Sequence, residues 1–402
     1  MDKLRELLIL ILLLPSLHSW AVTVRTYSTV EEMVSDKNIK KGDLLETVDY
    51  YSTLKGGGGR YVVSKEVRKD EFSVQLKNGF YAVLQYEKEL NVLKLGVKNN
   101  QSQDCSEIIN NALDKLAEKG GILYFPVGRY LVSQINIKNS VKLRGDESSY
   151  WNQGTMFFCH SKKDMICIDA QNVHIENIFF VGNQNDNIAI KANGSQNRSG
   201  LRISNVHINK FKIGIETDHY FLSSITNSRT ANCENGFVIK NATSFKLIQN
   251  WALVCGTGYD LSNSTYLDLD NCCSDECGGG YIIKDVKGIN INSCACEVSK
   301  EIPLYLKNAT ATISNFVGYK NNSEMRESTS LLLSENSTIV MIGCCDKDLY
   351  VSKLYLKSSP YSIKLVNSDL SIRGCVLNGS ISKNRQSSAS GSYVYKGQAK
   401  SL

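Results

Sequence analysis

The chain has 402 residues, of which 42% are hydrophobic and 21% are charged, and its formal net charge is +6. This composition indicates a folded protein with one large domain and a smaller module. The positive charge is spread thinly and forms no dense block of Lys and Arg, so we expect no nucleic-acid partner.

The first 21 residues have the order of a secretory signal peptide. Lys3 and Arg5 precede a mainly apolar stretch from Leu7 to Leu17, and small residues allow cleavage after Ser19 or Ala21. The apolar stretch is too short to span a bilayer comfortably, and no later segment could do so. The sequence therefore predicts a secreted or periplasmic protein with no membrane span once the signal is removed.

Residues 22–95 are predicted to form a small N-terminal β module with a glycine-rich hairpin. Four consecutive glycines, Gly56 to Gly59, lie between two strand-like runs. Since glycine tolerates positive φ and close backbone approach, this segment predicts a tight hairpin or a closely packed turn.

The segment 104–119 is the one convincing helix in the sequence. Asp104 or Ser106 can serve as its N-cap, apolar residues follow at helical spacing, and Gly120 marks its end. Because it directly precedes the first strands of a repeating array, we expect it to cover an otherwise open end with unpaired backbone groups.

Two strand-like motifs follow the helix: Gly120-Gly121-Ile122-Leu123-Tyr124-Phe125-Pro126-Val127-Gly128-Arg129-Tyr130 and then Val141-Lys142-Leu143-Arg144-Gly145. With Tyr50-Tyr51, the four glycines and the helix, they occur in an order that resembles the pectate-lyase-like superfamily of β-helix proteins. The likeness is greatest to the branch that holds phage tailspike depolymerases and rhamnogalacturonase- or epimerase-like proteins. It covers about residues 42–147.

One part of that pattern is missing. The branch usually carries an acidic Gly-Ala-x-x-Asp-Gly-x-x-Asp-Asp segment before the helix, of which only Gly96 and Asp104 match here. The resemblance implies a parallel β-helix that hydrolyses, cleaves by elimination, epimerises or only binds an extended polysaccharide.

The rest of the chain repeats with a period near 22 residues. Cys233, Cys255 and Cys277 are spaced by 22, and a second column consists of Asn241, Asn263, Asp285 and Asn308. A third column consists of Asn205, Asn227, Asn250, Asn271, Ser293 and Asn315. Such periods indicate a solenoid, and the Asn columns suit bends that need left-handed backbone conformations.

Each repeat contains two short runs that alternate apolar and polar residues, such as Thr265–Asn271, and none holds an amphipathic helix. The predicted fold is a right-handed, single-stranded parallel β-helix over residues 96–381, with roughly ten coils between Leu131 and Leu377. Residues 382–402 are predicted to be a polar tail. This tail shows no coiled-coil heptads, so homo-oligomerisation, including trimerisation, stays open.

Thirteen cysteines lie beyond the signal segment, an odd number that cannot pair completely. We expect Cys233, Cys255 and Cys277 to be reduced and stacked in the core. The nearby Cys272-Cys273 and Cys294-x-Cys296 groups lack the spacing and the histidines of a zinc site, so no metal site is predicted there.

Carboxylates distinguish the repeat at residues 260–276 from its neighbours. Alternation places Asp268 and Asp270 on one outward face, and in the same coil Asp260 precedes them and Asp275 and Glu276 follow. Paired carboxylates are what glycosidic hydrolysis needs, so these five residues are the predicted catalytic set. The same acids would suit Ca²⁺ in a lyase that neutralises a uronate, and solvated surface acids are the alternative.

A second candidate is Glu216-Thr217-Asp218-His219-Tyr220, where the period is interrupted. His219 and Tyr220 could act as base and acid in β-elimination from a uronic acid. Aromatic residues suited to sugar stacking include Trp251 and Tyr305, and also Tyr150 and Trp151.

Three functions follow from these residues. The first is an exported enzyme that cleaves glycosidic bonds of an extended, optionally acidic, polysaccharide with paired carboxylates. The others are a non-catalytic glycan-binding or scaffold β-helix and a uronate lyase. No cofactor is required for the first, and fold alone does not choose among the three.

Overall fold

A computed structural model describes residues 24–68, 70–117, 120–146, 153–183, 187–319, 321, 329–347, 361–395 and 397–402. The predicted signal segment 1–21, Tyr150 and Trp151 lie outside these residues. The chain divides into two compact units between Tyr86 and Glu87. The second unit thus begins before Gly96, the predicted boundary, because the strand at Glu89–Asn91 already pairs within the β-helix.

The first unit is a five-stranded sheet in the order β1-β2-β3-β5-β4 with one short helix. Its elements are β1 (Val24–Tyr27), α2 (Val30–Ser35), β2 (Leu44–Thr47), β3 (Arg60–Ser64), β4 (Ser73–Gln75) and β5 (Tyr81–Gln85). The predicted glycine-rich turn precedes β3. A Cβ at Gly58 would lie 2.2 Å from the carbonyl oxygen of Val48, so close backbone approach explains this glycine.

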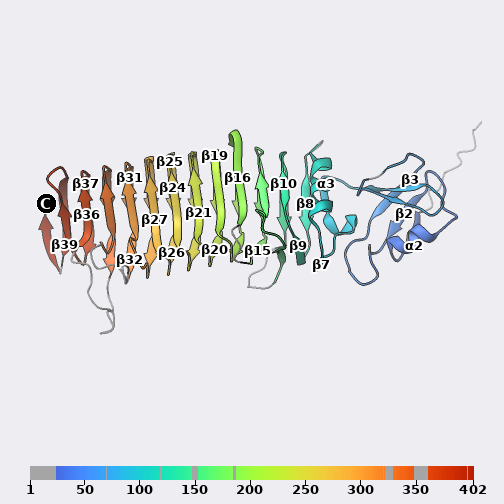
Figure 1. Ribbon diagram of the computed structural model, residues 1–402, viewed down its shortest axis with the longest axis horizontal. Helices are drawn as coiled ribbons and strands as arrows, with labels where there is room; N and C mark the ends of the chain where they lie inside the picture. Colours follow the sequence, from blue (N-terminus) through green and yellow to red (C-terminus); the bar gives the residue numbers. More distant parts are fainter. Residues whose placement is uncertain are drawn as a thin grey trace, which may run out of the picture. The chain divides into compact units, whose positions relative to one another are not determined.

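The second unit begins with β6 (Glu89–Asn91), the 3₁₀ helix η1 (Val92–Leu95), β7 (Asn100–Asp104) and α3 (Ser106–Leu116). The helix lies within the predicted range 104–119 and packs against strands β8 and β10 at the N-terminal end of the stack (Figure 1). Its buried residues are Ile109, Ala112, Leu113 and Leu116, the apolar face that the sequence predicted.

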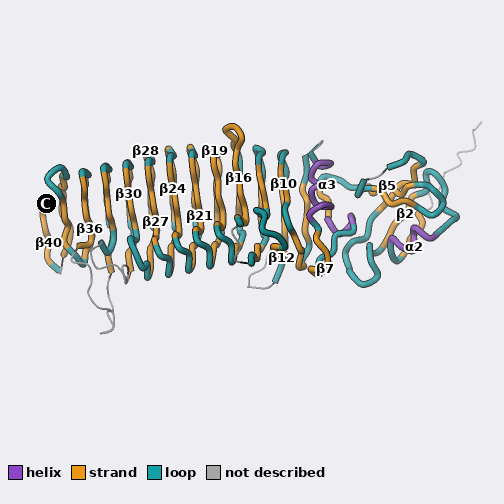
Figure 2. The backbone as a smooth tube through the Cα atoms, viewed as in Figure 1, coloured by secondary structure: helices purple, strands orange, loops and turns teal. Residues whose placement is uncertain are grey.

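The remaining strands stack in parallel in three columns (Figures 1 and 2). The first column contains β8 (Ile122–Phe125), β11 (Lys142–Gly145), β14 (His174–Glu176), β17 (Arg202–Ser204), the end of β19 (Ile213–Thr226), β22 (Thr243–Ile248), β25 (Thr265–Asp270), β28 (Lys287–Asn292), β31 (Thr310–Ser314), β34 (Thr338–Ile342) and the start of β37 (Asp369–Leu377).

The second column contains β9 (Gly128–Val132), β12 (Thr155–Cys159), β15 (Phe179–Val181), β18 (His207–Asn209), β20 (Arg229–Ala231), β23 (Trp251–Leu253), β26 (Cys273–Asp275), β29 (Ala295–Glu297), β32 (Val317–Tyr319) and β35 (Cys345–Lys347). The third contains β10 (Ile135–Ile137), β13 (Ile166–Ile168), β16 (Ile188–Ser199), the start of β19, β21 (Asn235–Lys240), β24 (Thr257–Ser262), β27 (Gly279–Lys284), β30 (Leu304–Lys307), β33 (Leu332–Glu335), β36 (Tyr361–Val366) and β38 (Ser380–Lys383).

The structure confirms the parallel β-helix, and ten described strands of the third column lie between Leu131 and Leu377, as the predicted coil number requires. The prediction of two strands per repeat was wrong, because each coil has a third strand in the second column. These strands, such as Trp251–Leu253 and Cys273–Asp275, have only three residues and are too short to show alternation in the sequence.

Inward side chains stack on their equivalents in the next coil and form one continuous core. The rings of Tyr259 and Tyr281 are nearly parallel and stack with their centroids 4.6 Å apart, and Phe237 stacks on Tyr259 at 5.0 Å. The Tyr281 hydroxyl donates a hydrogen bond to the carbonyl of Cys272 at 2.8 Å. The three repeat cysteines Cys233, Cys255 and Cys277 are buried and free, which confirms the reduced core stack.

The bends between columns use left-handed residues, as predicted for the Asn columns. Asn241, Asn263, Asp285 and Asn308 all have φ between 49° and 56°, and the Asn308 amide donates to the Asp285 carboxylate in the adjacent coil at 2.8 Å. In the other Asn column one assignment was wrong. Gln249 has φ 54° and occupies the bend, whereas Asn250 is 1% exposed and points inward.

The predicted polar tail at 382–402 is also corrected by the structure. β39 (Ser388–Tyr395) pairs in parallel with β37, and β40 (Gln398–Ser401) pairs antiparallel with β39. The sequence hid these strands because most of their side chains are polar and exposed.

Asn250 is a buried polar residue whose side chain bonds two backbone groups, so its substitution measures how much these hydrogen bonds stabilise the core. Its side-chain oxygen accepts the Ser228 N–H at 3.0 Å and its amide donates to the Ile225 carbonyl at 2.8 Å. We expect Asn250→Ala to lower the free energy of unfolding by about 2 to 4 kcal/mol, since two buried backbone groups lose their partners. Urea titration measures this change.

The matched control is Asn290→Ala, at an exposed outward position of β28. It is expected to change the free energy of unfolding by less than about 0.5 kcal/mol. Equal effects of the two substitutions would contradict a specific role for the buried amide.

Candidate functional site

The acids of the predicted catalytic coil do not converge. Asp260 points outward from the third column, Asp268 and Asp270 from the first, and Asp275 from the second, while Glu276 lies at a bend with φ 52°. The expectation that these five residues form one catalytic or Ca²⁺-binding group is therefore wrong, because the coil changes direction between its three strands.

Asp268 and Asp270 do share one face, as alternation predicted. Asp268 has Lys246 and Asn290 as register partners, and Asp270 accepts a hydrogen bond from the Asn292 amide at 2.8 Å. Asp275, in contrast, is the register partner of Glu297 in the next coil. Each acid therefore has its neighbours in its own column, on the coils before and after it, and not among the other acids of its coil.

The outward charged residues are denser on the third column, around the predicted site residue Asp260, than around the acids of the first column. Its central row runs Lys191, Glu216, Val238, Asp260, Ile282 and Tyr305 on successive coils. The adjoining row runs Asp218, Lys240, Ser262, Lys284 and Lys307. We call these two rows the third-column face.

Asp260 has the environment of a functional carboxyl. It is half-buried between Val238 and Ile282, and no hydrogen bond to its carboxylate is found among the described residues. Burial raises the pKa of Asp260 above its usual value, while the charges of Lys284 and Lys240 act in the opposite direction. A desolvated carboxyl between cations is the kind of group that enzymes use as a general acid.

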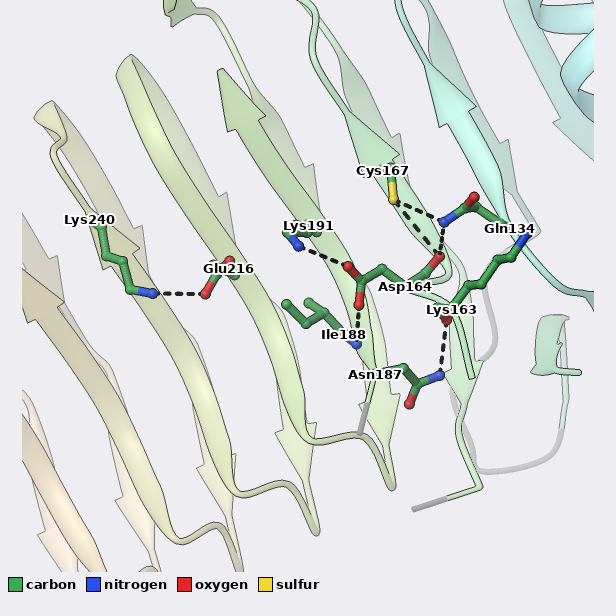
Figure 3. A network of polar contacts seen from close by, with 9 residues as sticks. All are labelled: Gln134, Lys163, Asp164, Cys167, Asn187, Ile188, Lys191, Glu216 and Lys240. Atoms are coloured by element: carbon green, nitrogen blue, oxygen red, sulfur yellow. Dashed lines mark hydrogen bonds and ion pairs between the residues drawn. The ribbon is translucent and has the colours of Figure 1, made fainter. Parts of the chain in front are cut away.

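Glu216 forms an ion pair with a lysine from the next coil. The Lys240 ammonium donates to Glu216 at 2.9 Å, and only 13% of the Glu216 side chain is exposed (Figure 3). Lys240 lies on the coil between Glu216 and Asp260 and acts electrostatically on both residues.

A polar network extends this row toward the N-terminal coils. Asp164 accepts hydrogen bonds from the Lys191 ammonium and the Ile188 N–H, each at 3.0 Å (Figure 3). The Asp164 hydrogen bond raises the pKa of Lys191, so this lysine stays charged beside Glu216. The network fixes the position of a cation at one end of the face.

Glu216 and Asp260 lie two coils apart in one row. Two parallel strand spacings amount to about 9.6 Å between backbones. Inverting glycosidases place their two carboxyl groups about 6.5 to 9.5 Å apart, with room for a water molecule, and retaining enzymes about 5 to 5.5 Å. This backbone spacing is close to the upper end of the inverting range and well above the retaining one.

His219 lies at the edge of this face, beside Asp218. Its Nδ1 is 2.7 Å from the Asp218 carboxylate, and 47% of its side chain is exposed. A carboxylate that orients Nδ1 leaves Nε2 available toward solvent. The second predicted segment therefore contributes Glu216, Asp218 and His219 to the same face as Asp260.

Tyr220 does not belong to the site, contrary to the prediction. It is fully buried, and its hydroxyl donates to the Ala170 carbonyl at 3.0 Å. Burial raises the pKa of Tyr220 to about 12. Because its side chain points into the core, it can neither contact a substrate nor donate a proton to one.

The two predicted aromatic ligands lie on different faces. Tyr305 points outward from the third-column face, and its hydroxyl donates to Glu335 at 2.9 Å. Trp251 is on the second column, where it is 37% exposed and stacks with Arg229 at 4.1 Å. Tyr305 therefore lies in the same row as Asp260, two coils further on, and Trp251 lies on another column.

Sequence reasoning missed the lysines of the third-column face. Lys240, Lys284 and Lys307 each stand two residues after a central-row position, and aligning the repeats in register would have shown them as one row. The described residues contain no group of three or more metal-binding side chains arranged to hold a metal ion. Within the same residues no helix is long and apolar enough to cross a membrane.

Residues 90–153 match the sequence profile of a family described as rhamnogalacturonase A/epimerase, pectate lyase-like. This segment contains the helix and the two strand motifs that suggested the resemblance, whereas Tyr50-Tyr51 and the four glycines lie before it. No curated protein matches the chain.

Solved structures share the fold at low sequence identity. Tailspike protein 2 from an Escherichia coli O157:H7 bacteriophage superposes with a TM-score of 0.63 at 11% identity, covering 92% of this chain and 53% of its own. A glycan biofilm modifying enzyme from Pantoea stewartii gives 0.60 at 13%, covering 94% and 52%. A mannuronan C-5 epimerase A-module from Azotobacter vinelandii gives 0.55 at 14%, covering 76% and 98%.

These likenesses confirm the predicted resemblance to tailspike- and epimerase-type parallel β-helices. The chain spans little more than half the length of the tailspike and the Pantoea enzyme, at 53% and 52%. At such identities the comparison establishes the fold, and activity has to be argued from the third-column face.

The electrostatic coupling within this face can be tested with Lys240→Met. Because the charge of Lys240 lowers the Asp260 pKa, we expect its removal to raise that pKa further above the ordinary value of 3.8. An NMR titration of carbon-13-labelled Asp carboxyls, assigned with Asp260→Asn, measures the change. Lys364→Met, at an exposed position of the same column, should leave the Asp260 titration unchanged.

Proposed function

We propose that the chain hydrolyses glycosidic bonds of an extended acidic polysaccharide on the third-column face. The carrying observation is the set Glu216, Lys240 and Asp260, in which a carboxylate paired with a lysine of the adjoining row lies two coils from a half-buried carboxyl with a raised pKa. The fold shared with glycan-modifying β-helix enzymes supports a substrate that is a long sugar chain.

The two carboxyl groups take different roles because their surroundings differ. Asp260, whose pKa is raised by burial, donates its proton to the glycosidic oxygen as the bond to the anomeric carbon breaks. Glu216 accepts a proton from a water molecule, whose oxygen attacks the opposite face of that carbon. The products are a hydroxyl group on the leaving sugar and a hemiacetal of inverted configuration. Asp260 then takes up a proton from solvent, and Glu216 releases one.

The lysines favour an anionic substrate. Lys284 and Lys307 are register partners on adjacent coils, so two cations stand side by side near Asp260 and Tyr305. Glu335 lies 3.8 Å from the Lys307 ammonium and offsets part of this positive charge, and a uronate carboxylate near Lys284 would offset the remainder. Tyr305 adds a ring edge, with the Lys284 ammonium 6.0 Å from its centroid.

A uronate lyase is the second candidate, favoured by the pair of His219 and Asp218. An imidazole oriented through Nδ1 can accept the C5 proton of a uronic acid at Nε2 while the 4-linked sugar leaves. The acid for the leaving group would then have to be Asp260, since Tyr220 is buried. A non-catalytic glycan-binding protein requires neither residue.

We also propose that the protein is secreted after removal of its N-terminal signal segment. Support comes from the cationic, apolar and small-residue order of residues 1–21. N-terminal sequencing of the mature product tests this, and a first residue at Trp20 or Val22 would agree with the two predicted cleavage positions.

The activity is tested with the mature protein on alginate, polygalacturonate and neutral polysaccharides, following reducing ends and unsaturated uronates together. We expect new reducing ends to form without an increase in the absorbance of unsaturated uronates. Asp260→Asn and Glu216→Gln should each lower kcat by about 10²- to 10⁴-fold, because each removes one proton-transfer group. Asp268→Asn, on another face, is the matched control and should keep the parent rate.

The pH profile and stability of Asp260→Asn provide a further check. The activity of the parent protein should fall as pH rises through the raised Asp260 pKa, since Asp260 must be protonated to act as the general acid. A raised carboxyl pKa also means that folding stability is lost as pH rises above the unfolded value, so Asp260→Asn should be no less stable than the parent near neutral pH.

Unsaturated products whose formation requires His219 would show that the protein is a lyase and not a hydrolase. Binding without turnover on every polysaccharide would replace both by a glycan-binding function. Full activity of Asp260→Asn would show that the third-column face is not the catalytic site.

A further inference from the structure

A second carbohydrate site is suggested by the second column, on a different face of the β-helix. Arg229, Trp251 and Cys273 are register partners on three successive coils, and Leu253, Asp275 and Glu297 follow in the adjoining row. We call these residues the Trp251 platform. None of them belongs to the third-column face.

The platform has an exposed aromatic ring in a fixed orientation. The Arg229 guanidinium lies 4.1 Å from the centroid of the Trp251 ring, which is 37% exposed. A cation over an indole ring is a favourable pair, so it holds the ring in place without closing it off from solvent. A ring fixed before binding loses little conformational freedom when a ligand stacks on it.

The next two positions of the same row are small. Cys273 and Ala295 follow Trp251 on the next two coils, so no large side chain of that row competes with a ligand for the side of the ring away from Arg229. The flat, apolar side of a pyranose ring can therefore approach the indole there, as amphipathic ligands commonly do with Trp.

Carboxylates border this position. Asp275 and Glu297 are register partners in the adjoining row, and Glu276 follows Asp275 at the bend. Desolvation and the neighbouring Glu297 and Glu276 raise the pKa of Asp275, with Arg229 opposing them. Two adjacent carboxylates offer several acceptor positions for sugar hydroxyls, and their negative charge disfavours a uronate.

From this geometry we infer that the Trp251 platform binds a neutral sugar unit of a polysaccharide. The ring stacks on Trp251, and its hydroxyls donate hydrogen bonds to Asp275 and Glu297. This site does not depend on the proposed hydrolysis, since it lies on another column and prefers a neutral ligand where the lysines of the third-column face prefer an anionic one. The protein would thus hold a glycan through one face while the other face acts.

The test is binding of the full chain to laminarin, dextran and galactomannan, with alginate and polygalacturonate as acidic probes, by isothermal titration calorimetry. We expect at least one neutral probe to bind, with Trp251→Ala weakening it by about tenfold or more, as for a central aromatic anchor. Asp275→Asn and Glu297→Gln should each weaken it, and more so in combination.

Tyr266→Ala is the matched control, since Tyr266 is a 69% exposed aromatic residue of β25, on the first column and outside the platform. It should bind the neutral probe as the parent does. Circular dichroism and thermal unfolding of each variant establish that it is folded. Asp260→Asn should keep neutral-probe binding and Trp251→Ala should keep turnover, which separates failure of this site from failure of the proposed function.

Several results would overturn the inference. One is the absence of binding to any neutral probe, and another is parent-like affinity of Trp251→Ala. Binding of the acidic probes alone, equal weakening by Tyr266→Ala, or binding of a single-stranded nucleic acid in place of every glycan would each assign the platform to another ligand or to none.

Discussion

The parallel register between successive coils is the constraint on which the rest of the structure depends. Each backbone N–H and C=O of a strand pairs with the coil before or after it, so an inward residue must lie against its equivalent one period later. The stacked rings of Tyr259 and Tyr281 and the buried cysteine column follow from this. A left-handed residue at each bend, often Asn, keeps the three columns aligned.

The same register arranges the outward side chains in rows. Groups that can act together therefore come from successive coils of the β-helix and not from one coil. Glu216, Lys240 and Asp260 come from three successive coils, and they are neighbours because their strands pair without a shift at these positions. Arg229 and Trp251 are brought together in the same way on the second column. Rows at strand spacing suit a ligand that is itself extended and repetitive, which is why both proposed sites concern sugar chains.

The two faces differ in charge, and the roles proposed for them differ for this reason. Lysines flank a desolvated carboxyl on the third column, whereas carboxylates flank a tryptophan on the second. A carboxyl of raised pKa has a use in proton transfer that a solvated acid lacks. An exposed indole next to hydrogen-bond acceptors has a use in sugar binding that needs no chemistry at all. Catalysis and attachment can therefore be separated on one rigid scaffold.

By itself the sequence determined the β-helix, its period, the capping helix and the Asn bends, because these depend on local alternation and on residue types that recur every 22 residues. It also pointed to Asp260, His219, Trp251 and Tyr305. Only the tertiary structure decided that Tyr220 and Asn250 are buried, that the polar residues after Ser388 form a strand, and that the acids of one coil face three ways. The physical reason is that a coil bends three times within 22 residues, so neighbours in sequence diverge, while the pairing of strands one period apart brings distant residues together.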